Sequence, residues 1–162
     1  MNYFVFPYQR ENFYVCPDSA LGRPDPHTGS LDYFIPDGIE TLRAIPFVYV
    51  KISRTGKSLR PDYAWRHYSE CGWGVHLCTF DVNEGNILDR SMFFSHTTKT
   101  DGDGPYEGFE FFDSALQRAS QYMTLRIGDA VILELEDIQA FEIQPDRVFD
   151  LSYKDFTIAL HS

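Results

Sequence analysis

Two side chains able to bind a metal ion stand two positions apart in the run GWGVHLCTFDV. Residues at this spacing on a β-strand point to the same face, so His76 and Cys78 would lie side by side. They could supply two ligands to zinc, but a tetrahedral zinc site needs about four ligands. The sequence shows no second paired cluster, so we favour a histidine packed inside the protein over a metal ligand.

Other polar residues are candidates for acid–base chemistry or anion binding. Lys99 follows the apolar run MFF, where its amine could act as a base or form a Schiff base, although an ordinary surface lysine is the simpler interpretation. With His76 and Asp81 it forms the set of candidate catalytic residues. The turn RTGK carries Arg54 and Lys57, which could hold an anion. We prefer to interpret them as an ordinary basic turn on an acidic protein.

Two further motifs are incomplete. The run DGDG at positions 101–104 is similar to part of a calcium loop, but the twelve-residue spacing and the terminal glutamate are absent. We therefore expect a solvated turn there. The serines lack the G-x-S-x-G pattern of a nucleophile elbow, so nucleophilic serine chemistry has no support.

The candidate residues depend on two predicted strands and the connection between them. The runs at residues 45–53 and 73–82 are apolar and rich in β-branched and aromatic residues, which predicts neighbouring central strands. Gly56, in the turn after the first run, is free to take a positive φ. A proline and an aspartate then begin the segment PDYAWRHYSE and suit the first turn of a helix, which we expect over residues 61–70.

The rest of the chain predicts a second helix and several shorter strands. The helix is expected over residues 113–122, with Asp113 as its N-cap and apolar residues at three-and-four spacing. Strands are expected at residues 2–6 and 12–16, in the run AVILEL and in the closing FEIQPDRVFDLSYKDFTIAL. The predicted fold class is α+β and β-rich, with two short helices in a single domain over residues 1–162.

Composition excludes several classes of protein. The 162 residues carry a formal net charge of −10, which would repel a phosphate backbone or an anionic membrane surface. We therefore expect no nucleic acid and no membrane among its partners. No apolar run reaches the roughly 20 residues of a membrane span, and the N-terminal MNYFVFPYQRE does not read as a signal peptide. Three cysteines are an odd, sparse set that favours a reduced, cytoplasmic protein.

Four segments, in order, resemble the fumarylacetoacetate hydrolase family in its short bacterial form. The segment KISRTGKSLRPDYAWRHYSECGWGVHLCTFDV resembles the family's R-I-x-x-x-G-K turn, its helix and its metal-bearing strand. The segments CPDSALGR, FFDSALQRASQYMTLRIGD and QPDRVFDLSYKDFTIAL resemble its K-P-D-T-A-L-L, F-D-E-I-I and closing-strand segments. The resemblance covers nearly the whole chain. It implies a mixed β-roll or sandwich of the family's C-terminal-domain type.

The departures from the family concern its metal site. The resemblance implies a magnesium or manganese ion held by an E-x-E pair on the first strand and an aspartate on the second. Counting from the RTGK turn and from Asp81, these positions fall on Ile45, Phe47 and His76. Hard cations prefer anionic oxygen ligands, and two of these three side chains have no donor atom. We therefore expect no metal and no cofactor, with Ile45 and Phe47 packed against apolar groups.

Other parts of the family's site are also missing. Phe80 stands where the family's T-A-R-D motif has its arginine, and the T-G-T-P loop is replaced by LELE at positions 133–136. The family's N-terminal segment, with a histidine on a lid, has no counterpart before Asn12, and one hairpin is deleted between positions 103 and 109. The lysine after the family's L-P-W segment is matched by Lys99.

The resemblance and its missing ligands predict a degenerate family member without metal-dependent hydrolase or decarboxylase activity. It would act as a binding or partner-regulating protein, as a homodimer or with an active paralogue, and a small-molecule acid is an expected ligand. The alternative is a working enzyme with a rebuilt, metal-free pocket. Such an enzyme would use Lys99, His76 and Asp81 in hydrolysis, decarboxylation or isomerisation of a small keto acid.

Overall fold

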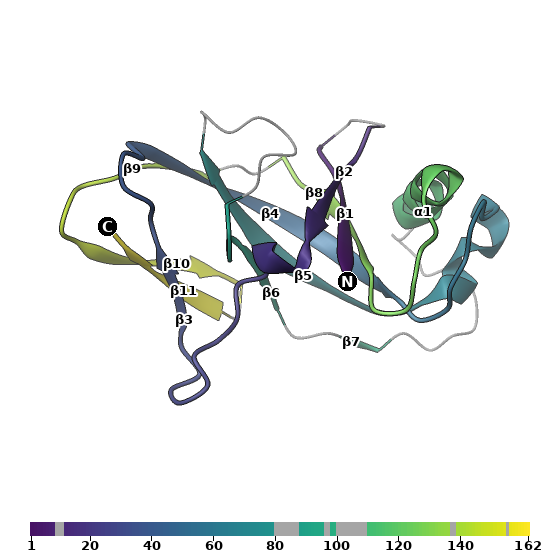
Figure 1. Ribbon diagram of the computed structural model, residues 1–162, viewed down its shortest axis with the longest axis horizontal. Coiled ribbons are helices and arrows are strands. Elements are labelled where there is room, and N and C mark those ends of the chain that lie inside the picture. Colours follow the sequence, from purple (N-terminus) through teal and green to yellow (C-terminus); the bar gives the residue numbers. More distant parts are fainter. Residues whose placement is uncertain (9–11, 80–87, 96–97, 100–109, 137–138, 155) are drawn as a thin grey trace.

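The computed structural model describes the chain except for residues 9–11, 80–87, 96–97, 100–109, 137–138 and 155. Two twelve-residue strands, β4 (Thr41–Ile52) and β5 (Tyr68–Thr79), run along the longest dimension of the molecule (Figure 1). The other strands are β1 (Asn2–Phe6), β2 (Tyr14–Pro17), β3 (Leu31–Phe34), β6 (Met92–Phe94), β7 (Thr98–Lys99), β8 (Ala130–Glu134), β9 (Gln139–Glu142), β10 (Val148–Tyr153) and β11 (Phe156–His161). The helices are two 3₁₀ helices, η1 (Asp18–Ala20) and η2 (Pro61–His67), and the α-helix α1 (Glu110–Tyr122).

Strands β4 and β5 pair in antiparallel orientation at the centre of the larger sheet. Its strand order is β2-β1-β8-β4-β5-β6, with β7 also beside β5 and β9 beside β4. The prediction of two neighbouring central strands is therefore confirmed. Both strands are longer than predicted, because the start of β4 pairs with β9 and β5 begins directly after η2.

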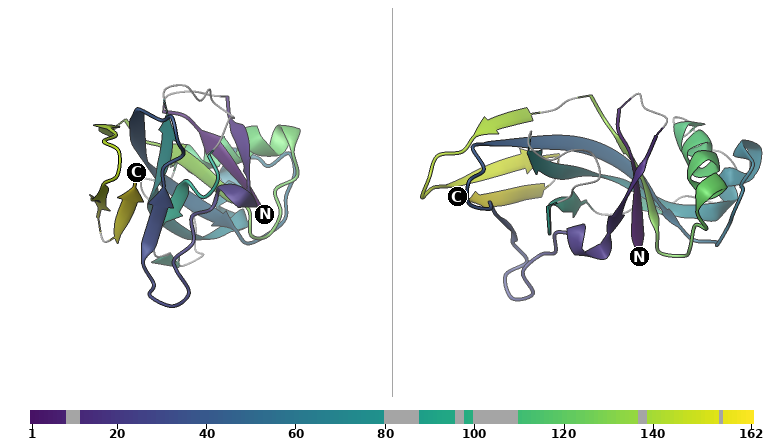
Figure 2. Two further views of the ribbon diagram at one scale, coloured as in Figure 1. Left: turned by 60° about the vertical axis from the view of Figure 1, so that its left-hand side comes forward. Right: turned by 45° about the horizontal axis from the view of Figure 1, so that its top comes forward.

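Different elements cover the two ends of the β4–β5 pair. A three-stranded sheet, in the order β10-β11-β3, lies at one end, and α1 with η2 lies at the other (Figure 2). At the first end, Leu42 packs in a core cluster with Ile158 and Leu160. At the second end, Val50 and Ile52 belong to a core cluster that includes the buried side of α1.

A third apolar cluster lies on the opposite face of β4. Side chains alternate between the two faces of a strand, so Phe47 and Tyr49 point away from α1. They pack with Tyr3, Ile132 and Met92 from neighbouring elements of the larger sheet. This face carries the positions that the family resemblance assigns to metal ligands.

The helix α1 begins three residues before its predicted start. It spans Glu110–Tyr122, so Asp113 lies inside the helix, and our prediction of Asp113 as the N-cap is wrong. The physical reason is Phe112, which is buried with Ala115 and Leu116 and extends the apolar face toward the N-terminus. The predicted end of the helix at residue 122 is confirmed. Within the described residues, no helix is long and apolar enough to cross a membrane.

The helix predicted over residues 61–70 is shorter and of a different type. It is the 3₁₀ helix η2, which ends at His67. Tyr68 is buried and already pairs with Ile52 as the first residue of β5, so strand pairing ends the helix early.

The turn before η2 also differs from the prediction. Gly56 is not among the residues with a positive φ, whereas Ser58 is, with a φ of 51°. A Cβ atom at Gly56 would lie 2.6 Å from Cδ2 of Leu59 and 2.9 Å from the His67 ring. Close packing, and not a left-handed backbone, is therefore what requires glycine at this position.

Candidate functional site

Ile45, Phe47 and His76 lie on one face of the β4–β5 pair. Ile45 stands directly opposite His76, and Phe47 stands opposite Gly74. The exposed fractions are 7% for Ile45, 0% for Phe47 and 4% for His76. The structure thus brings together the three positions that the family resemblance assigns to metal ligands, and it buries all three.

The ring of Phe47 fills the space over Gly74. A Cβ atom at Gly74 would lie 2.4 Å from Cζ of Phe47 and 2.3 Å from the carbonyl oxygen of Phe93. The Phe47 ring also meets the Phe94 ring edge-on, with 5.1 Å between their centroids. Phe47 therefore packs against apolar groups, as expected from its side chain.

A buried carboxylate, Glu134, lies beside His76. It is the last residue of β8 and stands opposite Phe47 in the pairing of β4 with β8. Nδ1 of His76 is 3.3 Å from Oε1 of Glu134, and the Tyr14 hydroxyl donates a 3.1 Å hydrogen bond to the same oxygen. Nε2 of His76 is buried and has no hydrogen-bond partner within the described residues. The contact with Glu134 thus holds Nδ1 of the imidazole in place, whereas Nε2 makes no hydrogen bond within the described residues.

Glu134 was not among the residues predicted for the site. The sequence does carry a signal, because an acidic residue follows the apolar run AVIL at a position that alternation places on the same face as Ile132. Its partners, however, lie 58 and 120 positions away in the chain. Local sequence patterns do not identify contacts at such separations.

Burial makes the thiols and the phenol of this face difficult to ionise. It raises the pKa of Cys16 to about 12, and the negative charge of Glu134 adds to the effect. The pKa of Tyr14 is raised by burial and then by the same carboxylate. Burial also raises the pKa of Cys78, against the opposing influence of Arg43. Because the thiolate is the form that binds metals and attacks electrophiles, neither cysteine is prepared for these roles.

These residues do not fit the magnesium or manganese ion that the family resemblance implies. Such ions are bound by several oxygen ligands, whereas Ile45 and Phe47 present only hydrocarbon. The carboxylate beside His76, Glu134, already accepts a hydrogen bond from Tyr14. Across the described parts of the chain, no group of three or more His, Cys, Asp or Glu residues is placed to hold a metal ion.

Of the other two candidate catalytic residues, Lys99 lies in the described chain, and its backbone is far from His76. The backbone of Lys99 pairs with Glu70, near the start of β5. His76 lies six positions further along this strand, which at about 3.3 Å per residue is roughly 20 Å away. Asp81 lies outside the described residues. The described side chain beside His76 is that of Glu134, and catalytic roles for Lys99 and Asp81 stay predictions.

The predicted anion site at the basic turn is open to solvent. Arg54 and Lys57 are both exposed between β4 and η2. The backbone carbonyl of Arg54 is 3.0 Å from Nδ1 of His67, a contact that ties the turn to η2. Anion binding by these two side chains stays a prediction.

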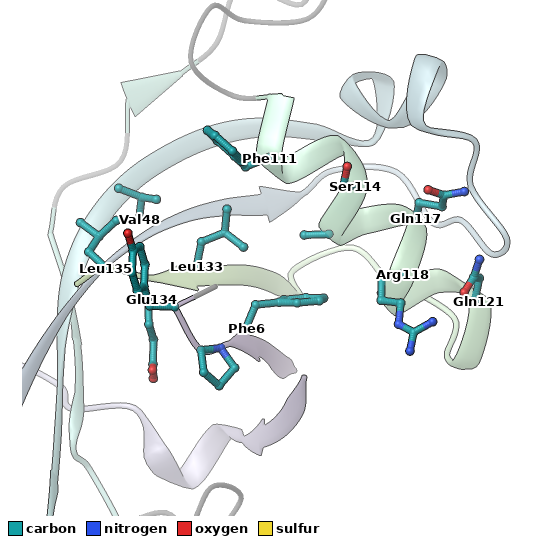
Figure 3. Close-up of a pocket in the computed structure, with 13 residues that line it drawn as sticks. Phe6, Val48, Phe111, Ser114, Gln117, Arg118, Gln121, Leu133, Glu134 and Leu135 are labelled. Atoms are coloured by element: carbon teal, nitrogen blue, oxygen red, sulfur yellow. The ribbon is translucent and has the colours of Figure 1, made fainter. Parts of the chain in front are cut away.

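A pocket of about 590 Å³ lies on the other face of β4 and β8, beside α1 (Figure 3). Side chains alternate between the two faces of a strand, so Val48 and Leu133 lie on the pocket face and Phe47 lies on the opposite face. Figure 3 shows that the side chain of Glu134 points away from the pocket. Arg118 lines the pocket from α1. The volume lies within the range of about 300–1,000 Å³ typical of small-molecule sites.

No protein-family model matches this sequence, and no curated protein is significantly similar to it. Solved structures do match. Fumarylpyruvate hydrolase from Pseudomonas aeruginosa, solved in complex with Mn²⁺ and pyruvate, is 12% identical with a TM-score of 0.73, over 99% of this chain and 88% of that chain. For 5-carboxymethyl-2-hydroxymuconate delta-isomerase from Mycobacterium smegmatis the identity is 12% and the TM-score 0.73, over 99% of this chain and 75% of that chain.

A third structure carries the family name. A protein from Yersinia pestis, described as belonging to the fumarylacetoacetate hydrolase family, is 14% identical with a TM-score of 0.66, over 99% of this chain and 91% of that chain. The described strands also agree with the predicted α+β, β-rich class. These likenesses extend over nearly the whole chain, and they confirm that it has the fold of the fumarylacetoacetate hydrolase family.

Proposed function

We propose that this chain is a fumarylacetoacetate hydrolase family member that has lost the metal-dependent reaction and acts by binding a small acid or a partner protein. The packing of Phe47 against Gly74 is the observation that carries the proposal. Phe47 is fully buried where the family resemblance requires a glutamate. A buried ring at this position supplies no ligand and occupies space that an ion and its ligands would need.

The energetics of burial support a structural role for this face. Truncation of a buried phenylalanine typically costs about 3–5 kcal/mol. A whole domain is held folded by only about 5–15 kcal/mol. The similar fumarylpyruvate hydrolase from P. aeruginosa was solved with Mn²⁺ and pyruvate. In our proposal this chain has the same fold as that protein, and the face that carries Phe47 stabilises the folded state by apolar packing.

One observation favours the alternative, a metal-free enzyme acting on a small keto acid. A histidine whose Nδ1 faces a carboxylate and whose Nε2 is uncommitted has the arrangement of a general base. His76 and Glu134 have this geometry, with 3.3 Å between Nδ1 and Oε1. Against the alternative stands the burial of His76, which is 4% exposed, so a substrate would have to displace the side chains around it.

Assembly and location form a separate part of the proposal. We propose a cytoplasmic bacterial protein that forms a homodimer or pairs with an active paralogue. Within the described residues Cys16 and Cys78 form no disulfide bond, which is typical of a reducing compartment. Light scattering at micromolar concentration checks the homodimer, since a mass of one chain would exclude it.

The proposed loss of metal chemistry is tested with the unmodified protein. Thermal melting with and without Mn²⁺ or Mg²⁺ is expected to give the same midpoint, because an ion that does not bind the folded state does not stabilise it. Oxaloacetate and acylpyruvate are expected to remain unconsumed. Metal-dependent turnover of either compound would contradict the proposal.

The variant His76→Gln separates the alternative from the proposal. Turnover without metal in the parent, lost in His76→Gln and retained in the exposed control His27→Gln, would establish the metal-free enzyme. Equal absence of turnover in all three proteins is the result that we expect.

A further inference from the structure

The pocket beside α1 has an apolar end and a charged end. In Figure 3, Val48 and Leu135 lie at one end, and Gln121 and Arg118 lie at the other, with the ring of Phe6 directed toward Arg118 between them. Much of the lining is apolar, as in typical small-molecule sites, and four of its polar side chains come from α1, namely Ser114, Gln117, Arg118 and Gln121. A ligand that fits this distribution must itself have an apolar part and a polar part.

Arg118 brings a positive charge to this pocket. Its guanidinium lies over the Tyr122 ring, with 5.1 Å between Cζ and the ring centroid. The Nε atom is buried and has no hydrogen-bond partner, and no side chain of the described residues forms an ion pair with Arg118. The acidic residue in the pocket lining, Glu134, has its carboxylate engaged with Tyr14 and His76 on the opposite face.

We propose that this pocket binds a small amphipathic carboxylate, with its hydrocarbon part against Leu133 and Phe6 and its carboxylate on Arg118. A guanidinium presents a planar fork of donors that matches a carboxylate in two parallel hydrogen bonds. The protein has a net charge of −10, so an anion is attracted to this local cation and repelled by most of the remaining surface.

This site is independent of the proposed loss of metal chemistry. Val48 and Leu133 belong to the face of β4 and β8 opposite to Phe47, and the carboxylate would bind whether or not His76 takes part in a reaction. The site rests on the proposed function only in naming where its small acid would bind, so a failure of octanoate binding would leave the proposed loss of metal chemistry intact.

Binding of sodium octanoate to the full chain, followed by isothermal titration and by amide chemical shifts, tests the site. Octan-1-ol serves as the uncharged probe of the same chain length. Octanoate is expected to bind the parent more tightly than octan-1-ol and to shift the amide signals of Leu133 and Ala115. Because Arg118→Gln removes the charged donor from the carboxylate, it is expected to weaken octanoate binding by about tenfold or more. Octan-1-ol binding should stay unchanged.

Arg66→Gln is the matched control. Its guanidinium also lies over a tyrosine ring, with Cζ 4.7 Å from the centroid of Tyr63, but it does not line the pocket. This variant should bind octanoate like the parent. Equal binding of octanoate by the parent and Arg118→Gln, equal binding of both probes by the parent, or shifts confined to other regions would overturn the proposal. Contacts between two copies of the chain across this pocket, detected by cross-linking, would overturn it as well.

Discussion

The two faces of β4 and β8 carry similar apolar side chains, yet one face is filled and the other holds a pocket. On the filled face, Phe47 meets Gly74 so closely that one added carbon would collide with the ring. On the other face, its neighbour Val48 lines a space of about 590 Å³, whose wall on α1 includes the small side chain of Ala115. On the filled face the Phe47 ring covers a glycine of the neighbouring strand, whereas on the other face Val48 and Ala115 leave space between β4 and α1.

The largest effect is expected from restoring the family's metal ligands on the filled face. The combined variant Ile45→Glu, Phe47→Glu and His76→Asp places three carboxylates on the filled face. We expect its free energy of unfolding to fall by at least about 3–5 kcal/mol, because a buried phenylalanine is lost and unpaired charges are buried. At about 2–4 °C per kcal/mol for a chain of this size, thermal melting will register the change clearly.

Phe34→Glu is the control for this experiment. It makes the same kind of replacement at a phenylalanine that is 71% exposed, so it should melt close to the parent. The combined variant should gain little from Mn²⁺ and should not turn over oxaloacetate or acylpyruvate. A variant that melts near the parent, is stabilised by Mn²⁺ and consumes substrate would show that the filled face is still an active-site frame.

The filled face should also make the protein sensitive to alkali. The pKa of Cys16 is raised from 9.0 to about 12, so between these values the unfolded thiol loses its proton while the folded one keeps it. Stability from this group is complete below pH 9 and is lost as the pH rises toward 12, at about 1.4 kcal/mol per pH unit. Urea titrations between pH 8 and about pH 11 should therefore show a smaller alkaline loss for Cys16→Ala than for the parent.

Cys71→Ala provides the comparison within this experiment. Burial also raises the pKa of Cys71, but this side chain is only partly buried, so its removal should change the alkaline slope less. Equal slopes for the parent and Cys16→Ala would show that Cys16 ionises normally in the folded protein.

A smaller change, Gly74→Ala, tests the contact at the centre of the filled face. Gly74 does not have a positive φ, so alanine is compatible with its backbone, and any cost is steric. The new Cβ would lie 2.3 Å from a carbonyl oxygen of Phe93, which no side-chain rotation can relieve. We expect a loss of about 1–3 kcal/mol, the usual cost of overpacking, measured by urea denaturation. An unchanged midpoint would show that the face has free space.

Much of this fold follows from sequence patterns. The central strands are long apolar runs, and both the packing of Phe47 and the end of α1 follow from side-chain type and spacing. The predicted start of α1 is three residues late, because burial of the apolar Phe112 side chain outweighs the capping tendency of Asp113. The predicted end of η2 at residue 70 is three residues late, because pairing of Tyr68 with Ile52, and not the helical pattern, sets where the segment ends.

The candidate sites were less predictable. Glu134 reaches His76 only because β4 and β8 pair, and that contact joins residues 58 positions apart. The pocket likewise depends on tertiary packing, because its lining combines residues of α1, such as Ala115, with Val48 of β4 and Leu133 of β8. Residue types in the sequence can mark polar groups inside strands, but they do not show which of them share a space.

Val48→Ile is expected to have the smallest effect of these changes on stability. It allows the cost of one added carbon to be compared between the filled face and the open face. Like Gly74→Ala it adds a single carbon to one of the two central strands, and it keeps the β-branched shape that suits a strand. The added methyl group would enter the open pocket, where the lining leaves about 590 Å³ unfilled. The free energy of unfolding should therefore stay within about 0.5 kcal/mol of the parent. Urea denaturation of Val48→Ile and Gly74→Ala under the same conditions measures the difference between the faces. A loss for Val48→Ile as large as that for Gly74→Ala would mean that the pocket closes in solution, and the contrast between a filled and an open face would then be wrong.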